Sequence, residues 1–137
     1  MIHLANKAES ELWPAHDLRK QVEVMRWVSW DAFHFAPHAG AFYFEYVVKP
    51  ALGLGETNPA ALESEAPQLE RSAAVLDAHL AQQPFLVGNA LTIADFCVGV
   101  LLPTAGETHL PLAGYKYIQR WHGRLMELDA WRNPWPE

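Results

Sequence analysis

The sequence has 137 residues, half of them hydrophobic, and this length suits one domain with a substantial core. The formal charge is −6, and the Lys and Arg residues form no basic stripe, which excludes nucleic acid as an expected partner. The single cysteine, Cys97, excludes an internal disulfide, and without a secretion signal or an apolar run of roughly 18 residues we expect a cytoplasmic protein.

Apolar residues recur at helical spacing along the whole chain, and strand-like alternation is absent, so we predict an all-helical protein. A short first helix is expected within residues 1–12. The second runs from an N-cap at Asp17 to about Ala36, where Pro37 bends or breaks it. Two apolar stripes follow this helix: Leu18, Val22, Met25, Ala32 and Phe35, and separately Trp27, Trp30, His34 and His38. A helix that is apolar on two sides lies at the centre of a bundle or faces a second partner.

The third helix is expected over about residues 39–52, before the glycines at 53 and 55. The fourth has the cleanest periodicity, with apolar residues every three or four positions from Leu62 to Leu80. Pro67 allows two interpretations of it: the helix kinks near Glu63, or its regular part begins at about Ser64 and Pro67 lies in the first turn. We favour the second, because proline inside a helix costs about 3 kcal/mol.

A tight turn is expected at Gly88, and the next helix begins at Thr92 and is interrupted by Pro103. A last helix follows from about residue 115 to residue 128. A short non-helical tail closes the chain, with residues Trp131, Pro134, Trp135 and Pro136.

The most specific local motif begins the helix at Thr92. Thr92 and Asp95 have the spacing of a capping box, in which each side chain accepts a hydrogen bond from the other residue's amide. Leu91 and Phe96 flank the box and are placed to form a hydrophobic staple. Removal of either capping side chain should cost about 1 kcal/mol or more.

The context of this motif resembles one protein family. Residues 85–95, Phe-Leu-Val-Gly-Asn-Ala-Leu-Thr-Ile-Ala-Asp, are similar to the stretch before the buried helix in the C-terminal domain of cytosolic glutathione S-transferases. Residues 110–112 and 115–121 resemble the penultimate loop and helix of that domain, with Trp131 in the closing position. Residues 26–35 resemble the first long helix of some bacterial members.

The resemblance covers roughly residues 17–132, and residues 1–12 look like the last helix of the thioredoxin-like domain that comes first in this family. It therefore implies two parts: a remnant of the thioredoxin-like domain at 1–12, and the helical domain at 13–137. The implied fold is an all-α bundle of about six helices, with the short first one included.

In this family the thioredoxin-like domain binds glutathione and supplies the catalytic Ser, Tyr or Cys. Nearly all of that domain is missing from this sequence, so the resemblance assigns no catalytic residue and no cofactor, and we expect no transferase activity from the chain alone. The helical domain would form the wall of the hydrophobic-substrate pocket. The side chains implied for this wall are Trp27, Trp30, Phe33, His34 and His38. The alternative is that these residues are core or dimer interface.

Two other groups of residues have types that could carry chemistry. Asp31, His34 and His38 could lie along one helical face and hold a metal, although Pro37 disturbs the spacing and no fourth ligand accompanies them, so no metal site is assigned. Cys97 is expected to fill the core rather than to react.

These observations leave three alternative interpretations of the function. The chain is the C-terminal domain of a glutathione transferase, or a stand-alone, non-catalytic helical module that binds a protein or an apolar ligand, or a metal-assisted enzyme that uses the Asp31 set. Because the many aromatic side chains need a cover, we expect a homodimer or a partner domain.

Overall fold

The computed structural model describes residues 1–134. Its helical segments, in chain order, are α1 (Ile2–Lys7), α2 (Leu18–Trp30), the π-helical η1 (Asp31–Phe35), α3 (Ala36–Tyr43), the π-helical η2 (Phe44–Val48), α4 (Lys49–Ala51), the 3₁₀ turn η3 (Pro59–Leu62), α5 (Ala66–Leu80), α6 (Ile93–Gly99), the 3₁₀ turn η4 (Leu102–Thr104), α7 (Lys116–Leu125) and α8 (Asp129–Arg132). The all-α prediction is confirmed. Because α2 continues through η1, and α3 through η2 and α4, the described residues form six main helices and the single-turn α8.

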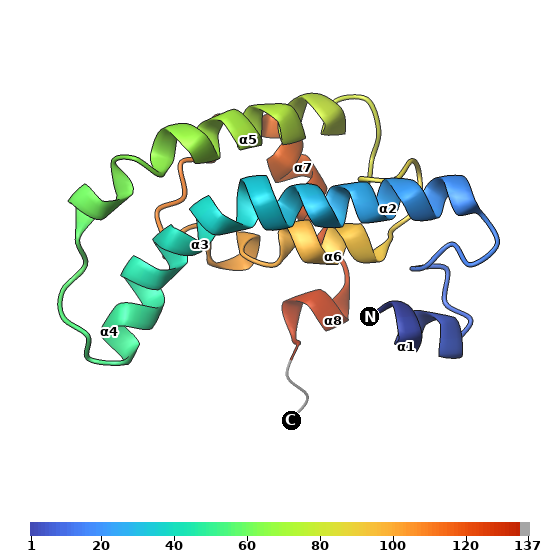
Figure 1. Ribbon diagram of the computed structural model, residues 1–137, viewed down its shortest axis with the longest axis horizontal. Helices are drawn as coiled ribbons and strands as arrows, with labels where there is room; N and C mark the ends of the chain where they lie inside the picture. Colours follow the sequence, from blue (N-terminus) through green and yellow to red (C-terminus); the bar gives the residue numbers. More distant parts are fainter. Residues whose placement is uncertain (135–137) are drawn as a thin grey trace.

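The first long helical rod begins and bends where the sequence predicts. Asp17 is the N-cap of α2, and its carboxylate accepts a hydrogen bond from the amide of Lys20 at 3.1 Å. Pro37 lies in the first turn of α3, just after the π-helical η1, and the rod changes direction there (Figure 1). A π-helical segment widens the helix by one residue per turn, which lets the backbone accommodate the proline.

The favoured interpretation of Pro67 is also confirmed. The regular helix α5 begins at Ala66, so Pro67 occupies its first turn, where no intrahelical donor is lost. At the other end of α5, Asp77 reaches the neighbouring helix α7: its Oδ1 accepts hydrogen bonds from the amides of Tyr117 at 2.7 Å and Ile118 at 2.9 Å. The side chain of Asp77 thereby caps a helix 40 residues further along the chain.

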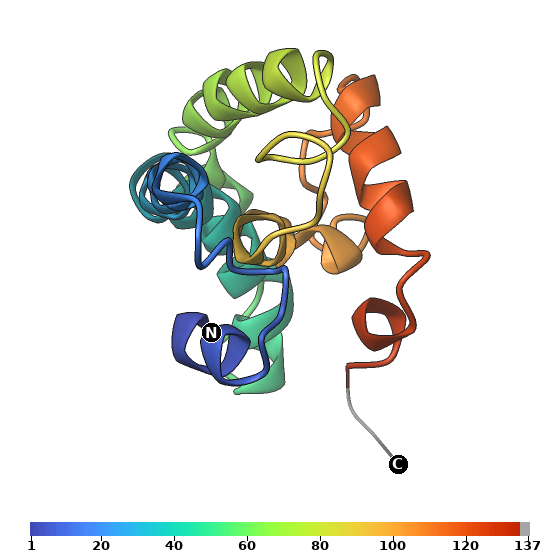
Figure 2. The same cartoon turned by 90° about the vertical axis from the view of Figure 1, so that its right-hand side faces the viewer.

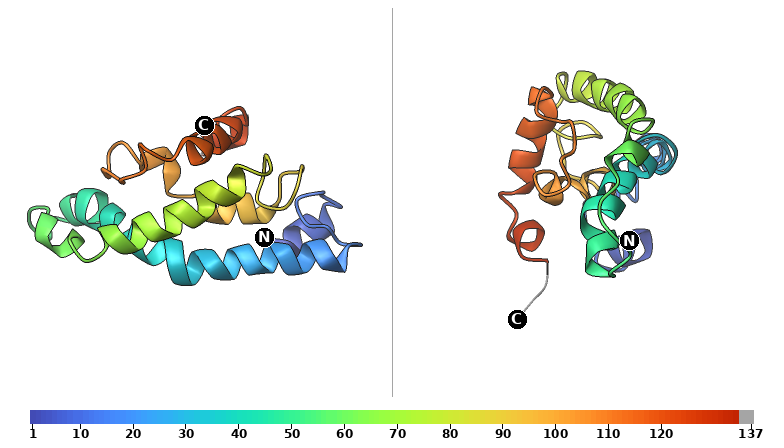
Figure 3. Two further views of the ribbon diagram at one scale, coloured as in Figure 1. Left: turned by 90° about the horizontal axis from the view of Figure 1, so that it is seen from above. Right: turned by 90° about the vertical axis from the view of Figure 1, so that its left-hand side faces the viewer.

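The helices surround α6. Viewed along the long axis, α6 lies in the middle, with α2 on one side, α7 on the other and α5 above them (Figure 2). Seen from above, α5 runs alongside the rod of α2 and α3 (Figure 3). Fully buried side chains from these helices and the loop before α6 fill the centre, among them Val24, Phe35, Leu69, Leu76, Leu80, Leu86, Val98, Ile118, Trp121 and Leu125. Each large apolar side chain buried here contributes roughly 1.5–3 kcal/mol.

The part of the first predicted stripe that lies on α2 faces outward. Leu18 is 75% exposed, and Val22 and Met25 are also exposed, whereas Val24 and Trp27 are buried. Both stripes had helical spacing, so periodicity alone could not choose between them. The side chains that reach the core come from both predicted stripes, Trp27 from one and Phe35 from the other, whereas His34 is exposed.

The C-terminal prediction was wrong for Trp131. This residue lies in α8 rather than in a non-helical tail, and its ring packs on that of Phe96 with 5.5 Å between centroids. Extended backbone at Leu128 lets the chain start a new helical turn. Trp135 and Pro136 lie outside the described residues. None of the helices within residues 1–134 has the length and apolar character needed to cross a membrane.

Candidate functional site

Thr92 and Asp95 form a capping box at the start of α6. The amide of Thr92 donates to Asp95 Oδ2 at 2.9 Å, and the Thr92 hydroxyl donates to the same oxygen at 3.1 Å. One carboxylate oxygen of Asp95 thus accepts both bonds, and the amide of Asp95 donates to the carbonyl of Thr92 at 3.1 Å. Leu91 is half-buried against the core and Phe96 packs on Trp131, so a staple between Leu91 and Phe96 remains a prediction.

Asp95 also binds residues that the sequence motif does not contain. Its Oδ1 accepts hydrogen bonds from the amide of Leu86 at 2.9 Å and from the indole N–H of Trp121 at 3.0 Å. The side chain is fully buried, and burial raises the pKa of Asp95, an effect that the four hydrogen bonds oppose. Asp95 is thus a structural carboxylate that joins the loop before α6, the start of α6, and α7.

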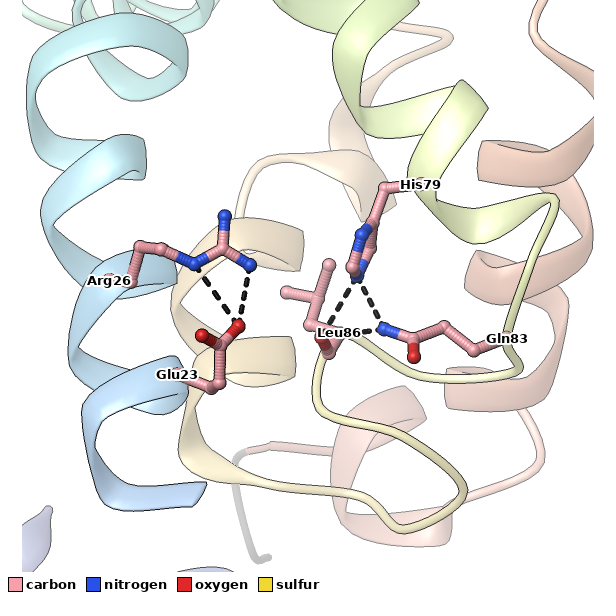
Figure 4. A network of polar contacts seen from close by, with 5 residues as sticks. All are labelled: Glu23, Arg26, His79, Gln83 and Leu86. Carbon is pink, nitrogen blue, oxygen red and sulfur yellow. Dashed lines mark hydrogen bonds and ion pairs between the residues drawn. The ribbon is translucent and has the colours of Figure 1, made fainter. Parts of the chain in front are cut away.

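Leu86 extends this network towards α5. Its carbonyl accepts hydrogen bonds from His79 Nε2 and from the side-chain amide of Gln83, each at 2.9 Å (Figure 4). On α2, Arg26 and Glu23 form an exposed ion pair with 2.6 Å between Nη2 and Oε2, and Figure 4 shows it on the side of α2 turned towards this group. The turn at Gly88 completes the loop, with φ of +76°, a left-handed conformation that favours glycine.

The five side chains predicted for a substrate wall do not gather in one place. Trp27 is only 2% exposed, packs against Trp30 and His79, and has no hydrogen-bond partner for its indole N–H. Phe33, in contrast, is 76% exposed. Trp27 therefore belongs to the core, and Phe33 to the outer surface.

The other three side chains meet at a shallow hollow. Trp30, His34 and His38 line a cavity of about 270 Å³ between the α2–α3 rod and α5. The α5 residues on its other side are Gln68, Arg71, Ser72 and Val75. We call this cavity the α5 hollow. His38 Nδ1 lies 2.6 Å from a carboxylate oxygen of Glu65, and the Ser72 hydroxyl donates to the carbonyl of His34 at 2.6 Å.

Asp31 does not share this hollow, which separates it from the two histidines proposed with it as metal ligands. Its charge acts instead on Cys97 of α6. Within residues 1–134, no three His, Cys, Asp or Glu side chains come together in a way that could hold a metal ion. Cys97 is half-buried, and burial, together with the nearby Asp31, raises the pKa of its thiol, which keeps the thiol in its less reactive form.

Asp31 itself is half-buried without a hydrogen-bond partner among the described residues, and burial raises its pKa to about 6. The folded state thus favours the neutral carboxyl, so the stability contributed by Asp31 is complete below the unfolded pKa near 4 and is lost as pH rises through 6.

We expect Asp31→Asn to raise the free energy of unfolding at pH 7.5 by about 1–2 kcal/mol, after allowance for solvent screening. Urea denaturation of the variant and of the unsubstituted protein would measure this difference. At pH 4 the difference should approach zero, and a difference that is independent of pH would contradict the assignment.

A larger cleft lies on the α1 side of the molecule. Its volume is about 1070 Å³, and it is lined by residues between Ala5 and Lys20 and by the loop from Val87 to Thr92. Composition and periodicity gave no indication of this cleft, because it forms between two irregular segments.

The architecture of this bundle has a counterpart among known families. The profile described as "Glutathione S-transferase, C-terminal domain" matches residues 35–129, more than half of the chain. The chain belongs to the glutathione S-transferase family. Its helical bundle is the C-terminal domain of that family, as the residues around the Thr92 capping box indicated.

Individual relatives of this domain lead to the same family assignment. Glutathione S-transferase 3 of Zea mays is 35% identical over 115 residues, which cover 82% of this chain and 50% of the maize protein. Elongation factor 1-gamma-B of Xenopus laevis is 34% identical over 88 residues, or 64% of this chain and 19% of that protein. A solved structure of glutathione S-transferase I bound with lactoylglutathione has the same fold, with a TM-score of 0.85 at 22% identity, over 96% of this chain and 63% of that one. The chain thus spans half or less of these curated relatives.

Proposed function

We propose that this chain serves as the C-terminal domain of a glutathione S-transferase-like protein, in which it forms one wall of a hydrophobic-substrate pocket. A thioredoxin-like domain would supply the glutathione site and the catalytic residue, so the chain alone is inactive. The observation that carries this proposal is the family match over residues 35–129, and the alignment with the maize relative covers half of that protein. The cytoplasmic location expected from the single cysteine belongs to the same proposal.

The packing of residues 1–12 supports a thioredoxin-like domain on the α1 side of the bundle. Ala5 of α1 is buried, and the amide of Ile93 donates to the carbonyl of Leu12 at 3.0 Å, so residues 1–12 lie against the start of α6. If these residues are the end of a thioredoxin-like domain, the glutathione site lies on the α1 side, and the large cleft there is the natural substrate wall. Trp30, His34 and His38, which the resemblance implies for the wall, line the α5 hollow, and their place in a substrate wall remains a prediction.

A glutathione-conjugation assay tests the proposal. The chain alone should give no turnover with glutathione and an aryl halide. A chimera that joins the N-terminal half of the maize relative to residues 13–137 should give turnover that saturates with both substrates. Saturable turnover by the chain alone would overturn the proposal, as would an inactive chimera that folds and still binds glutathione.

A second role, docking of a second copy of the chain, is favoured by the outer surface of α2. Leu18, Val22, Met25 and Phe33 form an exposed apolar row, the outer row, about 22 Å long. The match to elongation factor 1-gamma-B shows only that this domain also occurs outside transferases.

We expect charge in the outer row to weaken self-association. The double variant Val22→Glu, Met25→Glu should raise the dimer dissociation constant at least tenfold in sedimentation equilibrium, because desolvating two carboxylates at an apolar contact is unfavourable. Val100→Glu is the control, since Val100 is 60% exposed and follows α6 rather than lying on α2. Equal effects of the two changes, or a wild-type chain that stays monomeric at high concentration, would count against this role.

A further inference from the structure

Two polar side chains at the end of α5 share one backbone oxygen. His79 lies in the last turn of α5 and Gln83 in the turn that follows, and both are half-buried. The carbonyl oxygen of Leu86 lies 2.9 Å from His79 Nε2 and 2.9 Å from Gln83 Nε2, and the two nitrogens are 2.5 Å apart (Figure 4). Each pair is within hydrogen-bond distance, so the three atoms form a closed triangle.

The triangle cannot hold all three hydrogen bonds at once. A side-chain amide nitrogen always carries hydrogens, whereas an imidazole nitrogen is either a donor or an acceptor. Two N–H groups cannot both point into a gap of 2.5 Å, so His79 Nε2 is bare when the amide nitrogen of Gln83 faces it. Neutral His79 then carries its proton on Nδ1, and Gln83 is the donor to the Leu86 carbonyl. The bonds of this carbonyl to His79 and to Gln83 therefore belong to different protonation states.

The surroundings leave the His79 ring free to change its protonation state through this triangle alone. Within residues 1–134 its hydrogen bonds run only to Leu86 and Gln83, and its face packs on Trp27 with 4.4 Å between centroids. The charged side chains that frame this region each have a partner of their own: Glu23 and Arg26 on α2, Asp77 on α5, Asp95 on α6, and Arg120 and Arg124 on α7. The last turn of a helix, at the negative end of its dipole, is compatible with a charged ring.

We propose that His79 and Gln83 form a proton-controlled latch on the loop before α6. When His79 takes up a proton from solvent, Nε2 becomes the donor to the Leu86 carbonyl, and the amide of Gln83 turns its nitrogen away. The amide of Leu86 stays bonded to Asp95 in both states. Leu86 leads into the segment from Val87 to Thr92, which lines the cleft on the α1 side, so the protonation state of His79 alters the wall of that cleft.

The tautomer of His79 tests the latch. In long-range ¹H–¹⁵N spectra we expect the neutral ring to carry its proton on Nδ1, the reverse of the form that imidazole favours in water, with the exposed His3 and His16 as internal references. On acidification both nitrogens of His79 should be protonated. The side-chain amide protons of Gln83 should then exchange about tenfold faster relative to those of its exposed neighbour Gln82, as expected for the loss of one hydrogen bond.

Two matched variants separate the latch from general titration. Gln83→Leu removes the donor that keeps Nε2 bare, so the neutral ring should revert to the Nε2–H form, whereas Gln82→Leu should leave the tautomer unchanged. In the unsubstituted protein the backbone amide resonances of the loop from Val87 to Thr92 should titrate together with His79. This titration should be lost in His79→Phe, which keeps an aromatic ring at the position.

Three outcomes would overturn the proposal. They are an Nε2–H form of neutral His79 in the unsubstituted protein, the same tautomer in Gln83→Leu as in the unsubstituted protein, and loop titration that persists in His79→Phe. The first measurement needs no variant, so it decides the matter even if a substitution unfolds the chain. All the measurements use the chain alone without glutathione, so their results do not depend on the function proposed above.

Discussion

Asp95→Ala should lower the free energy of unfolding by about 3–5 kcal/mol, because it leaves buried donors without an acceptor. The donors are the amides of Leu86 and Thr92 and the indole N–H of Trp121, and each lies within 3.0 Å of the carboxylate. An orphaned buried donor costs about 1–3 kcal/mol, and a water molecule admitted by the smaller side chain would recover part of this. Urea denaturation followed by far-ultraviolet circular dichroism measures the change.

Two further variants make this test quantitative. Asp95→Asn keeps one acceptor oxygen for Leu86 and Trp121 but places an amide beside the amide of Thr92, so a smaller loss of about 1–3 kcal/mol is expected. Asp129→Ala is the control, because that side chain is 80% exposed. If Asp95→Ala cost no more than the control, Asp95 would not be the hydrogen-bond centre of the fold.

Asp77→Ala should lower the free energy of unfolding by about 2 kcal/mol. Its carboxylate accepts hydrogen bonds from two amides in the first turn of α7, and the N-cap residue Tyr115 makes no side-chain capping bond of its own. Such charge-assisted bonds at a helix start are stronger than neutral caps, since the carboxylate also interacts favourably with the helix dipole. Thermal or urea unfolding would measure the loss.

Asp17→Ala gives the comparison for Asp77. Asp17 caps α2 locally through one bond of 3.1 Å to the Lys20 amide, and that bond is exposed. A loss of about 0.5–1 kcal/mol is expected for it. Asp77→Asn retains an acceptor and should lie between the two. Equal losses for Asp17→Ala and Asp77→Ala would show that the contact between α5 and α7 adds nothing beyond an ordinary cap.

The sequence predicted those features of the fold that depend on neighbours along the chain. The cap at Asp17, the position of Pro67 and the turn at Gly88 all follow from residues within one helical turn, and the structure agrees with each. The Thr92–Asp95 spacing is of the same local kind. The partners of Asp95 on the loop and on α7 could not be predicted, because they are 9 and 26 residues away and depend on how the helices pack.

The candidate sites were harder to predict for the same reason. Trp27, Trp30 and His34 share helical spacing, but the bundle buries the first, half-buries the second and turns the third towards α5.

The contacts of Asp95 also bear on how the domain opens. One carboxylate ties together residues at sequence separations of 3, 9 and 26, so α7 cannot detach without exposing the start of α6 and the preceding loop at the same moment. Local fraying at these three places is therefore coupled into one cooperative event. The backbone amide protons of Leu86 and Thr92 should exchange with deuterated solvent at a common rate, set by global unfolding, while those of the loop near Gly53 exchange much sooner.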